Sequence, residues 1–152
     1  MESTLREVFE GKSYGNVNFL PFLPKNSQVN DYLNSIDIDI GGMSGAEGWN
    51  LPAFNSTCLG KWSIVLNSTS HKEWATQENC ILIEPDGKEP IYDGIFFNEG
   101  SDFNQGNMYT FDEDELMSAM DKAEVLCKNE NKEGLKLKNK FTYKKTLEKI
   151  LE

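Results

Sequence analysis

Apolar and polar positions along this chain predict short strands that alternate with short helices. Residues 63–66 and 80–83 are compact, largely apolar runs of the kind found in buried strands. Residues 36–40 (IDIDI) alternate apolar with acidic residues, as a half-buried strand does. A fourth run, 16–23, contains Pro21, which cannot donate a ladder hydrogen bond, so we expect it at a sheet edge. Helical patterns or helix-end signals lie between and after these runs, at residues 3–10, 28–34, 52–60, 71–75, 111–128 and 142–151.

Strands that alternate with helices predict an α/β domain, with a Rossmann-like parallel sheet between flanking helices. A length of 152 residues fits a single domain, 1–152, closed by the helix at about 142–151. Residues 84–110 are irregular and rich in glycine, asparagine and aromatic residues, and their length exceeds that of an ordinary connection. Residues 129–140 are expected to form a charged linker before the closing helix.

Charge and composition narrow the classes of function. With 25 acidic and 15 basic groups the net charge is −10, a field that repels polyanions and disfavours a nucleic-acid partner. No apolar run approaches the roughly 20 residues of a membrane span, and the first residues lack an apolar signal core, so a cytoplasmic protein is expected. Three cysteines without metal-ligand spacing indicate reduced thiols and no metal site.

Residues 37–66 contain the segment of the chain that is most suggestive of a ligand-binding site. There a predicted strand ends in a glycine-rich stretch, 41–48, which leads into a helix with Pro52 in its first turn. Glycines let a backbone approach a ligand closely, and the unpaired N–H groups and positive dipole end of a helix N-terminus favour a phosphate. Glycine-rich stretches are also ordinary turns, so the spacing by itself leaves both interpretations open.

The segment AEGWNLPAFNSTCLGKWSIVLNSTSHKEWATQENCILIEP is similar to the core of the retaining glycosyltransferases of family 4. That family has two Rossmann-like domains (the B-type, or GT-B, fold) and a pattern E-G-(F/W)-G-L-P followed by G-x-P-V. FDEDELMSAMDKA and FTYKKTLEKIL resemble its later acidic-capped helix and its closing helix. The chain thus resembles a C-terminal, donor-binding half of that fold. The positions that fall on the pattern are Glu47, Gly48, Trp49, Leu51, Pro52, Gly60, Ile64 and Val65.

The resemblance implies a role for each matching residue. Glu47 would lie at the donor sugar and diphosphate as the catalytic residue. Asn55 would contact the ribose where the family has a glutamate, which keeps hydrogen bonding but loses a charge. The donor implied is a nucleotide-diphosphate sugar carrying a hexose, with no separate cofactor and no metal. The backbone amides that would cradle its diphosphate belong to Gly48, Trp49, Asn50 and Leu51.

The family's acceptor-binding domain, and the basic pair that neutralises the leaving diphosphate, have no counterpart in this sequence. We therefore expect a truncated domain that transfers sugar only when completed by a companion acceptor-domain chain, and no turnover by the chain alone. A second copy of the chain is another expected partner, because the missing strands would leave sheet edges exposed. The alternative is a non-catalytic nucleotide or nucleotide-sugar-binding module, or a relict domain that acts as an assembly surface.

Several residues keep two interpretations. Glu47 is also interpretable as a helix cap or a solvated carboxylate, and His71 equally as a surface residue or a ligand contact. The aromatic stretch 92–109 is interpretable as a lid or subunit contact, or as core packing under a long loop. The acidic run 112–115 is read as favourable charge at a helix N-terminus rather than as a metal site. The tryptophans are expected in the core or at its rim, although Trp49 could also touch a nucleoside.

Overall fold

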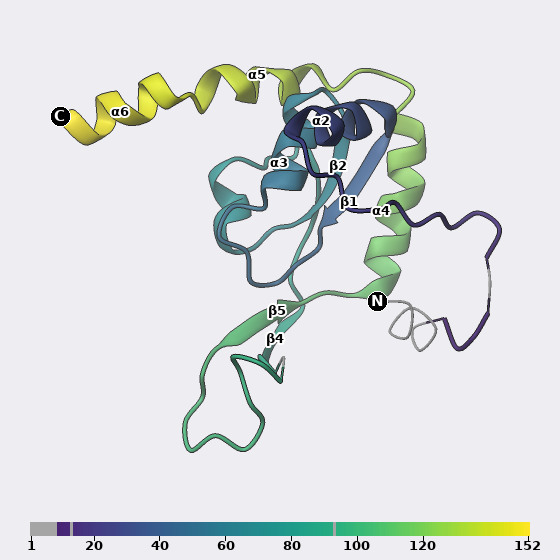
Figure 1. Cartoon of the computed structure of the whole chain (residues 1–152), viewed down its shortest axis with the longest axis vertical. Helices are drawn as coiled ribbons and strands as arrows, with labels where there is room; N and C mark the ends of the chain where they lie inside the picture. The colour runs from purple at the N-terminus through teal and green to yellow at the C-terminus, as the bar shows by residue number, and fades with distance from the viewer. Residues whose placement is uncertain (1–8, 13, 93) are drawn as a thin grey trace.

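A computed structural model describes residues 9–12, 14–92 and 94–152 and shows a mixed α/β protein (Figure 1). Its centre is a parallel sheet of three strands in the order β1 (Ile38–Gly42), β2 (Trp62–Leu66) and β3 (Ile81–Ile83). Asp39 lies opposite Ser63, and Val65 lies opposite Leu82. The predicted parallel sheet with flanking helices is therefore confirmed, although the sheet is small, and the arrangement is compatible with a Rossmann-like domain.

Strand β2 is buried on both faces, as a central parallel strand must be. Val65 packs with Phe54 of α3 (Leu51–Cys58) and with Leu137 of α5 (Lys132–Lys140). Its neighbours Ile64 and Leu66 point the other way, toward Ala119 and Ala123 of α4 (Glu113–Leu126). The helices thus cover both faces of the sheet, and each face carries its own apolar core. Their buried apolar members are Ala53, Phe54, Val65, Trp74, Ala75, Cys80 and Leu137 on one face and Ile64, Leu66, Ile81, Ile83, Ala119 and Ala123 on the other.

The chain before the sheet differs from expectation. Helix α2 (Asn26–Ser35) confirms the helix predicted at 28–34, but residues 16–23 form no strand. Phe19, Leu20 and Phe22 are exposed, although the ring of Phe19 lies edge-on to that of Phe9. Of the helix predicted at 3–10, residues 3–8 lie outside the described part of the chain.

Strand β1 follows the alternation of IDIDI only in part. Ile38 packs against the core that contains Ile64 and Leu66, yet Asp39 is buried and Ile40 is exposed. The carboxylate of Asp39 accepts a hydrogen bond of 2.9 Å from the Gly41 N–H. That bond compensates part of the cost of burying a carboxylate, which local alternation cannot reveal.

Residues 84–110 contain a hairpin that the irregular composition did not predict. Strands β4 (Gly87–Pro90) and β5 (Asn107–Thr110) pair antiparallel and form a separate two-stranded sheet below the main body (Figure 1). The two hairpin strands are separated by 16 residues, so no local turn sequence predicts their pairing.

A short 3-10 helix, η1 (Thr69–Glu73), lies at nearly the same place in the chain as the short helix predicted at 71–75.

The expected linker at 129–140 is wrong, because most of it is helix α5. Asn131 is buried and caps this helix: its side chain accepts from the Gly134 N–H at 2.8 Å. The same side chain donates to the carbonyl oxygens of Lys61 and Asn79, at 2.9 and 2.8 Å. One asparagine thus fastens α5 to two loops of the sheet. The closing helix is confirmed as α6 (Tyr143–Leu151).

No helix in the part of the chain that the structure describes has both the length and the apolar character needed to cross a membrane.

Candidate functional site

The predicted glycine-rich loop leaves the carboxyl end of β1 and enters α3. Two of its glycines are required by packing within the protein. A Cβ on Gly42 would lie 2.5 Å from the carbonyl oxygen of Ile64, and one on Gly45 would overlap the carbonyl oxygen of Tyr109. Tyr109 of β5 also donates its N–H to the Gly45 carbonyl oxygen at 3.1 Å. The hairpin therefore anchors this part of the loop, and these glycines are explained without a ligand.

Gly48 differs from these two glycines. A Cβ built on it meets no atom within 4 Å, so its surroundings are open. In the described part of the chain, the backbone N–H groups of residues 47–51 make no hydrogen bond. They lead into the first turn of α3, which begins at Leu51 and where the helix dipole is positive. This stretch has the chemistry of an anion site, namely consecutive free donors beside open space.

Asn50 holds the loop in place. Its backbone is left-handed, with φ of 58°, and its side-chain oxygen accepts from the Ala53 N–H at 3.3 Å as the N-cap of α3. Its side-chain nitrogen donates to the Gly41 carbonyl oxygen at 2.7 Å. The side chain is buried and fully committed to the fold. Only the backbone amide of Asn50 is therefore free for the ligand contact that the sequence predicts.

Glu47 is half-buried and its carboxylate makes no hydrogen bond or ion pair with any residue that the structure describes. It does not cap α3, since Asn50 does so. A carboxylate with free acceptor atoms beside free amide donors can accept hydrogen bonds from a hydroxylated ligand whose anionic part the amides hold. Glu47 and residues 48–51 thus form the candidate site.

Asn55 lies elsewhere. Together with Leu51 it lines a groove of about 600 Å³ between α2 and α3, whose wall also includes Lys138 of α5. Trp49 points to a third place, where its ring packs edge-on against Phe54 and Phe141. The predicted site residues therefore do not line one cavity: Glu47 and Gly48 lie on the loop, Leu51 and Asn55 in the groove, and the Trp49 ring at the core rim.

The tryptophans and the histidine have structural partners. Trp74 is buried and its ring N–H donates to the Trp49 carbonyl oxygen at 3.1 Å, which confirms the prediction of core and rim tryptophans. His71 is fully buried, with Nδ1 2.8 Å from the Leu66 carbonyl oxygen, so the interpretation as a surface residue is wrong. Asp112 accepts from the Asp114 N–H at 2.8 Å as N-cap of α4, which confirms the helix-terminus reading of the acidic run.

Three buried or half-buried acidic groups, those of Asp39, Cys58 and Cys80, have raised pKa values. Burial raises the pKa of Asp39 above its ordinary value, and the hydrogen bond from Gly41 lowers it in part. Burial raises the pKa of Cys58 to about 11 and that of Cys80 to about 12, so both thiols stay protonated at neutral pH. All three cysteines are free. Sequence reasoning missed Asp39, because nothing in IDIDI distinguishes its carboxylate from that of Asp37.

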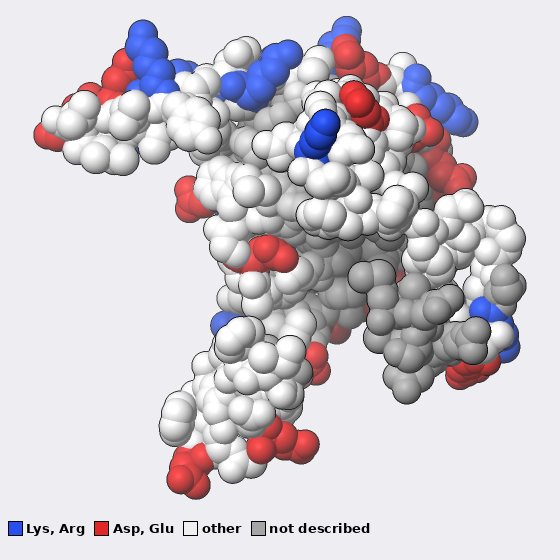
Figure 2. Space-filling view, viewed as in Figure 1, with Lys and Arg blue, Asp and Glu red and all other residues white. Residues whose placement is uncertain are grey.

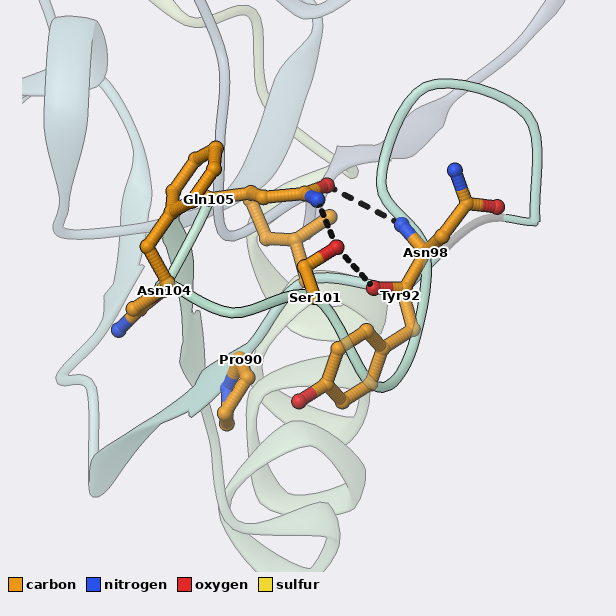
Figure 3. A pocket seen from close by; sticks show the side chains of 8 residues that line it. Pro90, Tyr92, Asn98, Ser101, Asn104 and Gln105 are labelled. Carbon is orange, nitrogen blue, oxygen red and sulfur yellow. Dashed lines mark hydrogen bonds between the residues drawn. The ribbon is translucent and has the colours of Figure 1, made fainter.

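The loop that joins β4 to β5 encloses a hollow of about 200 Å³ (Figure 3). Gln105 accepts from the Asn98 N–H at 3.1 Å and donates to Ser101, whose hydroxyl donates to the Asn98 carbonyl oxygen. These bonds close the loop on itself. Ile95, Phe96 and Phe103 are exposed, so they do not form core packing beneath the loop. Among the described residues no group of three or more histidine, cysteine or acidic side chains is placed to hold a metal ion.

Comparison with known proteins adds no assignment: no protein-family model matches the chain, and no curated protein matches it.

Proposed function

We propose that this chain is the donor-binding, C-terminal half of a GT-B glycosyltransferase, which binds a nucleotide-diphosphate sugar at the loop before α3. Five consecutive backbone amides without a partner, at residues 47–51, support this assignment most directly. They would hold the diphosphate, as free N–H groups at a helix N-terminus do. The unpaired carboxylate of Glu47 would accept hydrogen bonds from hydroxyls of the donor sugar.

The position of the loop agrees with this role. In open α/β sheets ligands bind beyond the carboxyl ends of the strands, and the loop begins where β1 ends. Asn50 fixes the loop between Gly41 and Ala53, so the amides are held in place before any ligand arrives. Such preorganisation reduces the entropy lost on binding. Hexose transfer would require an acceptor-binding domain from a companion chain.

Calorimetric titration with UDP, GDP, ADP and their hexose conjugates tests the proposal. We expect saturable binding of one of these ligands, weakened roughly ten- to hundredfold by Glu47→Ala through loss of charge-assisted hydrogen bonds. Glu124→Ala, on the outer face of α4, is the matched control and should bind like the unchanged chain. Absence of binding at millimolar ligand, or equal loss in both variants, would refute the site.

A non-catalytic nucleotide-binding module is the second candidate. The neutral residue Asn55 stands where the resemblance calls for a carboxylate, and the described lysines make no ion pair or hydrogen bond with residues 41–55. A leaving diphosphate gains negative charge in the transition state and needs such compensation. Release of nucleotide diphosphate from a bound nucleotide sugar by the chain alone would exclude this candidate, whereas binding without release would favour it.

A further inference from the structure

The carbonyl oxygen of Trp49 is held inside the protein by the ring of Trp74. The ring N–H of Trp74 donates to this oxygen at 3.1 Å, and Trp74 is only 1 % exposed. The peptide bond between Trp49 and Asn50 is trans and planar, so its C=O and N–H groups point in opposite directions. Because the Trp49 carbonyl oxygen points into the core, the N–H group of Asn50 points away from the core.

Helix α3 orients the next amide. The carbonyl oxygen of Asn50 accepts from the Phe54 N–H at 3.0 Å, along the helix axis. The N–H group of Leu51 belongs to the same peptide, so it points out of the N-terminal end of the helix. Asn50 has φ of 58° and ψ of 67°, and the helical residue Leu51 follows it. A left-handed residue followed by a helical one turns successive N–H groups toward a common side, an arrangement that binds anions and is called a nest.

These two amides are the last ones available before the helix begins to use its own donors. Pro52 has no N–H group, and the Ala53 N–H donates to the side-chain oxygen of Asn50. Of the free amides at residues 47–51, those of Asn50 and Leu51 therefore have directions that hydrogen bonds of the described chain fix.

The ring of Trp74 is itself fixed on two sides. Phe54 and His71 lie edge-on to it, with ring centroids 5.4 and 5.9 Å away. The carbonyl oxygen of Trp74 accepts from the side chain of Asn79 at 2.9 Å. The donor that holds Trp49 thus belongs to the packed core rather than to the loop.

Without this bond the same peptide could take the opposite orientation. Rotation of the Trp49–Asn50 peptide plane by about half a turn would bring φ of Asn50 from 58° to about −120°, on the negative side where non-glycine residues ordinarily lie. The Trp49 carbonyl oxygen, instead of the Asn50 N–H, would then face the ligand. Because a carbonyl oxygen repels an anion that an N–H group attracts, the direction of this one peptide decides whether the nest can form.

Backbone dipoles are the source of positive potential that the structure places on the loop itself. The described lysines make no ion pair or hydrogen bond with residues 41–55. On the face that Figure 2 shows, most basic side chains gather along the upper side, where α2, α5 and α6 lie in Figure 1. The attraction of the loop for an anion therefore depends on the direction of its N–H groups.

We propose that Trp74 is a positioning residue of the anion site: it turns the Trp49–Asn50 peptide so that the amides of Asn50 and Leu51 together hold one phosphoryl group of the ligand. This inference rests on the nucleotide-sugar site proposed above, and it specifies which two amides hold that group. The buried ring of Trp74 acts through Trp49 and does not touch the ligand.

Titration of the full chain with inorganic pyrophosphate, followed by calorimetry and by NMR, tests the inference. We expect saturable binding, with the largest downfield shifts of amide protons at Asn50 and Leu51, because both donate charge-assisted hydrogen bonds. Trp74→Phe keeps an aromatic ring but has no ring N–H, and it should weaken the binding roughly tenfold. Trp62→Phe is the matched control: the ring N–H of Trp62 donates to the Asn129 carbonyl oxygen at 3.2 Å, at the amino end of β2, so its loss should leave the affinity unchanged.

A measurement without ligand separates the orientation of the peptide from a general loss of stability. The NOE between the amide and α protons of one residue is strong where φ is positive. For Asn50 it should be strong in the unchanged chain and in Trp62→Phe, and weaker in Trp74→Phe. If Trp74→Phe does not fold, replacement of Trp74 by benzothienylalanine, which has sulfur in place of the ring N–H and nearly the same shape, provides the same test.

Several results would overturn the positioning role. They are an unchanged pyrophosphate affinity in a folded variant that lacks the Trp74 N–H, an equal weakening by Trp62→Phe, larger shifts at residues 47–49 than at Asn50 and Leu51, and no binding of millimolar pyrophosphate. Nucleotides that bind equally well with and without the Trp74 N–H would leave the donor site standing and refute the positioning role. Pyrophosphate that binds as expected, together with no binding of any nucleotide or nucleotide sugar, would support the positioning role and refute the donor site.

Discussion

The side chain of Asn50 donates a hydrogen bond of 2.7 Å to the carbonyl oxygen of Gly41, which ties the start of α3 to the end of β1. The same side chain caps α3 through Ala53, and its backbone occupies the left-handed region that asparagine tolerates better than other side chains. One residue therefore fixes the path of the loop that carries the candidate anion site. Asn50 thus has a structural role that does not depend on any ligand.

Removal of this asparagine should destabilise the fold in a graded way. Asn50→Ala loses the cap, the bond to Gly41 and the tolerated backbone conformation, and we expect a loss of about 2–4 kcal/mol in the free energy of unfolding. Asn50→Gly keeps the conformation and should lose about 1 kcal/mol less. Urea denaturation followed by circular dichroism measures both. Equal stability of the two variants would show that the left-handed backbone contributes nothing.

Two glycines of the same loop should respond in opposite ways to alanine. Gly45→Ala forces a methyl group against the backbone of Tyr109, and we expect a loss of about 3 kcal/mol or a displaced hairpin. Gly48→Ala meets open space and should change stability by less than about 0.5 kcal/mol.

A larger side chain at position 48 should weaken ligand binding without affecting folding. Gly48→Val should leave the fold intact and weaken nucleotide binding roughly tenfold or more, because its branched side chain would occupy the space next to the free amides. Thermal denaturation and calorimetric titration of the same preparation report the two effects. Unchanged affinity in a folded Gly48→Val variant would place the ligand elsewhere.

Asn131 should be among the most sensitive polar positions in the chain. Asn131→Ala removes three hydrogen bonds and leaves the carbonyl oxygens of Lys61 and Asn79 without that partner, and we expect a loss of about 3 kcal/mol. Asn131→Asp keeps the acceptor for Gly134 but cannot donate, so it should also destabilise. Exposed Asn139→Ala on the same helix is the control, with little expected change in the urea midpoint.

The raised pKa of Asp39 predicts how the stability of the folded chain changes with pH. Its pKa is higher in the folded chain than the ordinary value of 3.8, so the folded state holds this proton more tightly than the unfolded state. The contribution of Asp39 to stability therefore falls as the pH rises from about 3.8 through the raised pKa, and its cost is complete above that pKa.

Asp39→Asn should remove this cost while its side-chain oxygen still accepts from Gly41. We expect the variant to be more stable than the unchanged chain at pH 7, with a difference that narrows toward pH 4. Urea midpoints at a series of pH values provide the measurement, and Asp37→Asn, which alters an exposed carboxylate, is the control. A difference that is constant across the series would rule out titration of Asp39 as its source.

Much of the fold was predictable because its determinants are local. The runs at 63–66 and 80–83 are short and largely apolar, as buried parallel strands are, and both lie on strands. Pro52 and Gly60 bracket α3 because proline fits a first turn and Gly60 takes φ of 83°. For the candidate site, the sequence located the loop and singled out Glu47 and Gly48, which the structure leaves unpaired and open.

The parallel α/β core could be predicted from the chain alone, because apolar runs, helix caps and helix stops act through neighbouring residues. The contacts between distant segments depend on packing in three dimensions: Tyr109 against Gly45, Asn131 between Lys61 and Asn79, and the burial of Asp39 rather than Ile40. Such contacts join residues that are up to 70 positions apart. Each depends on the packed position of both partners, and no periodicity within one segment encodes that position.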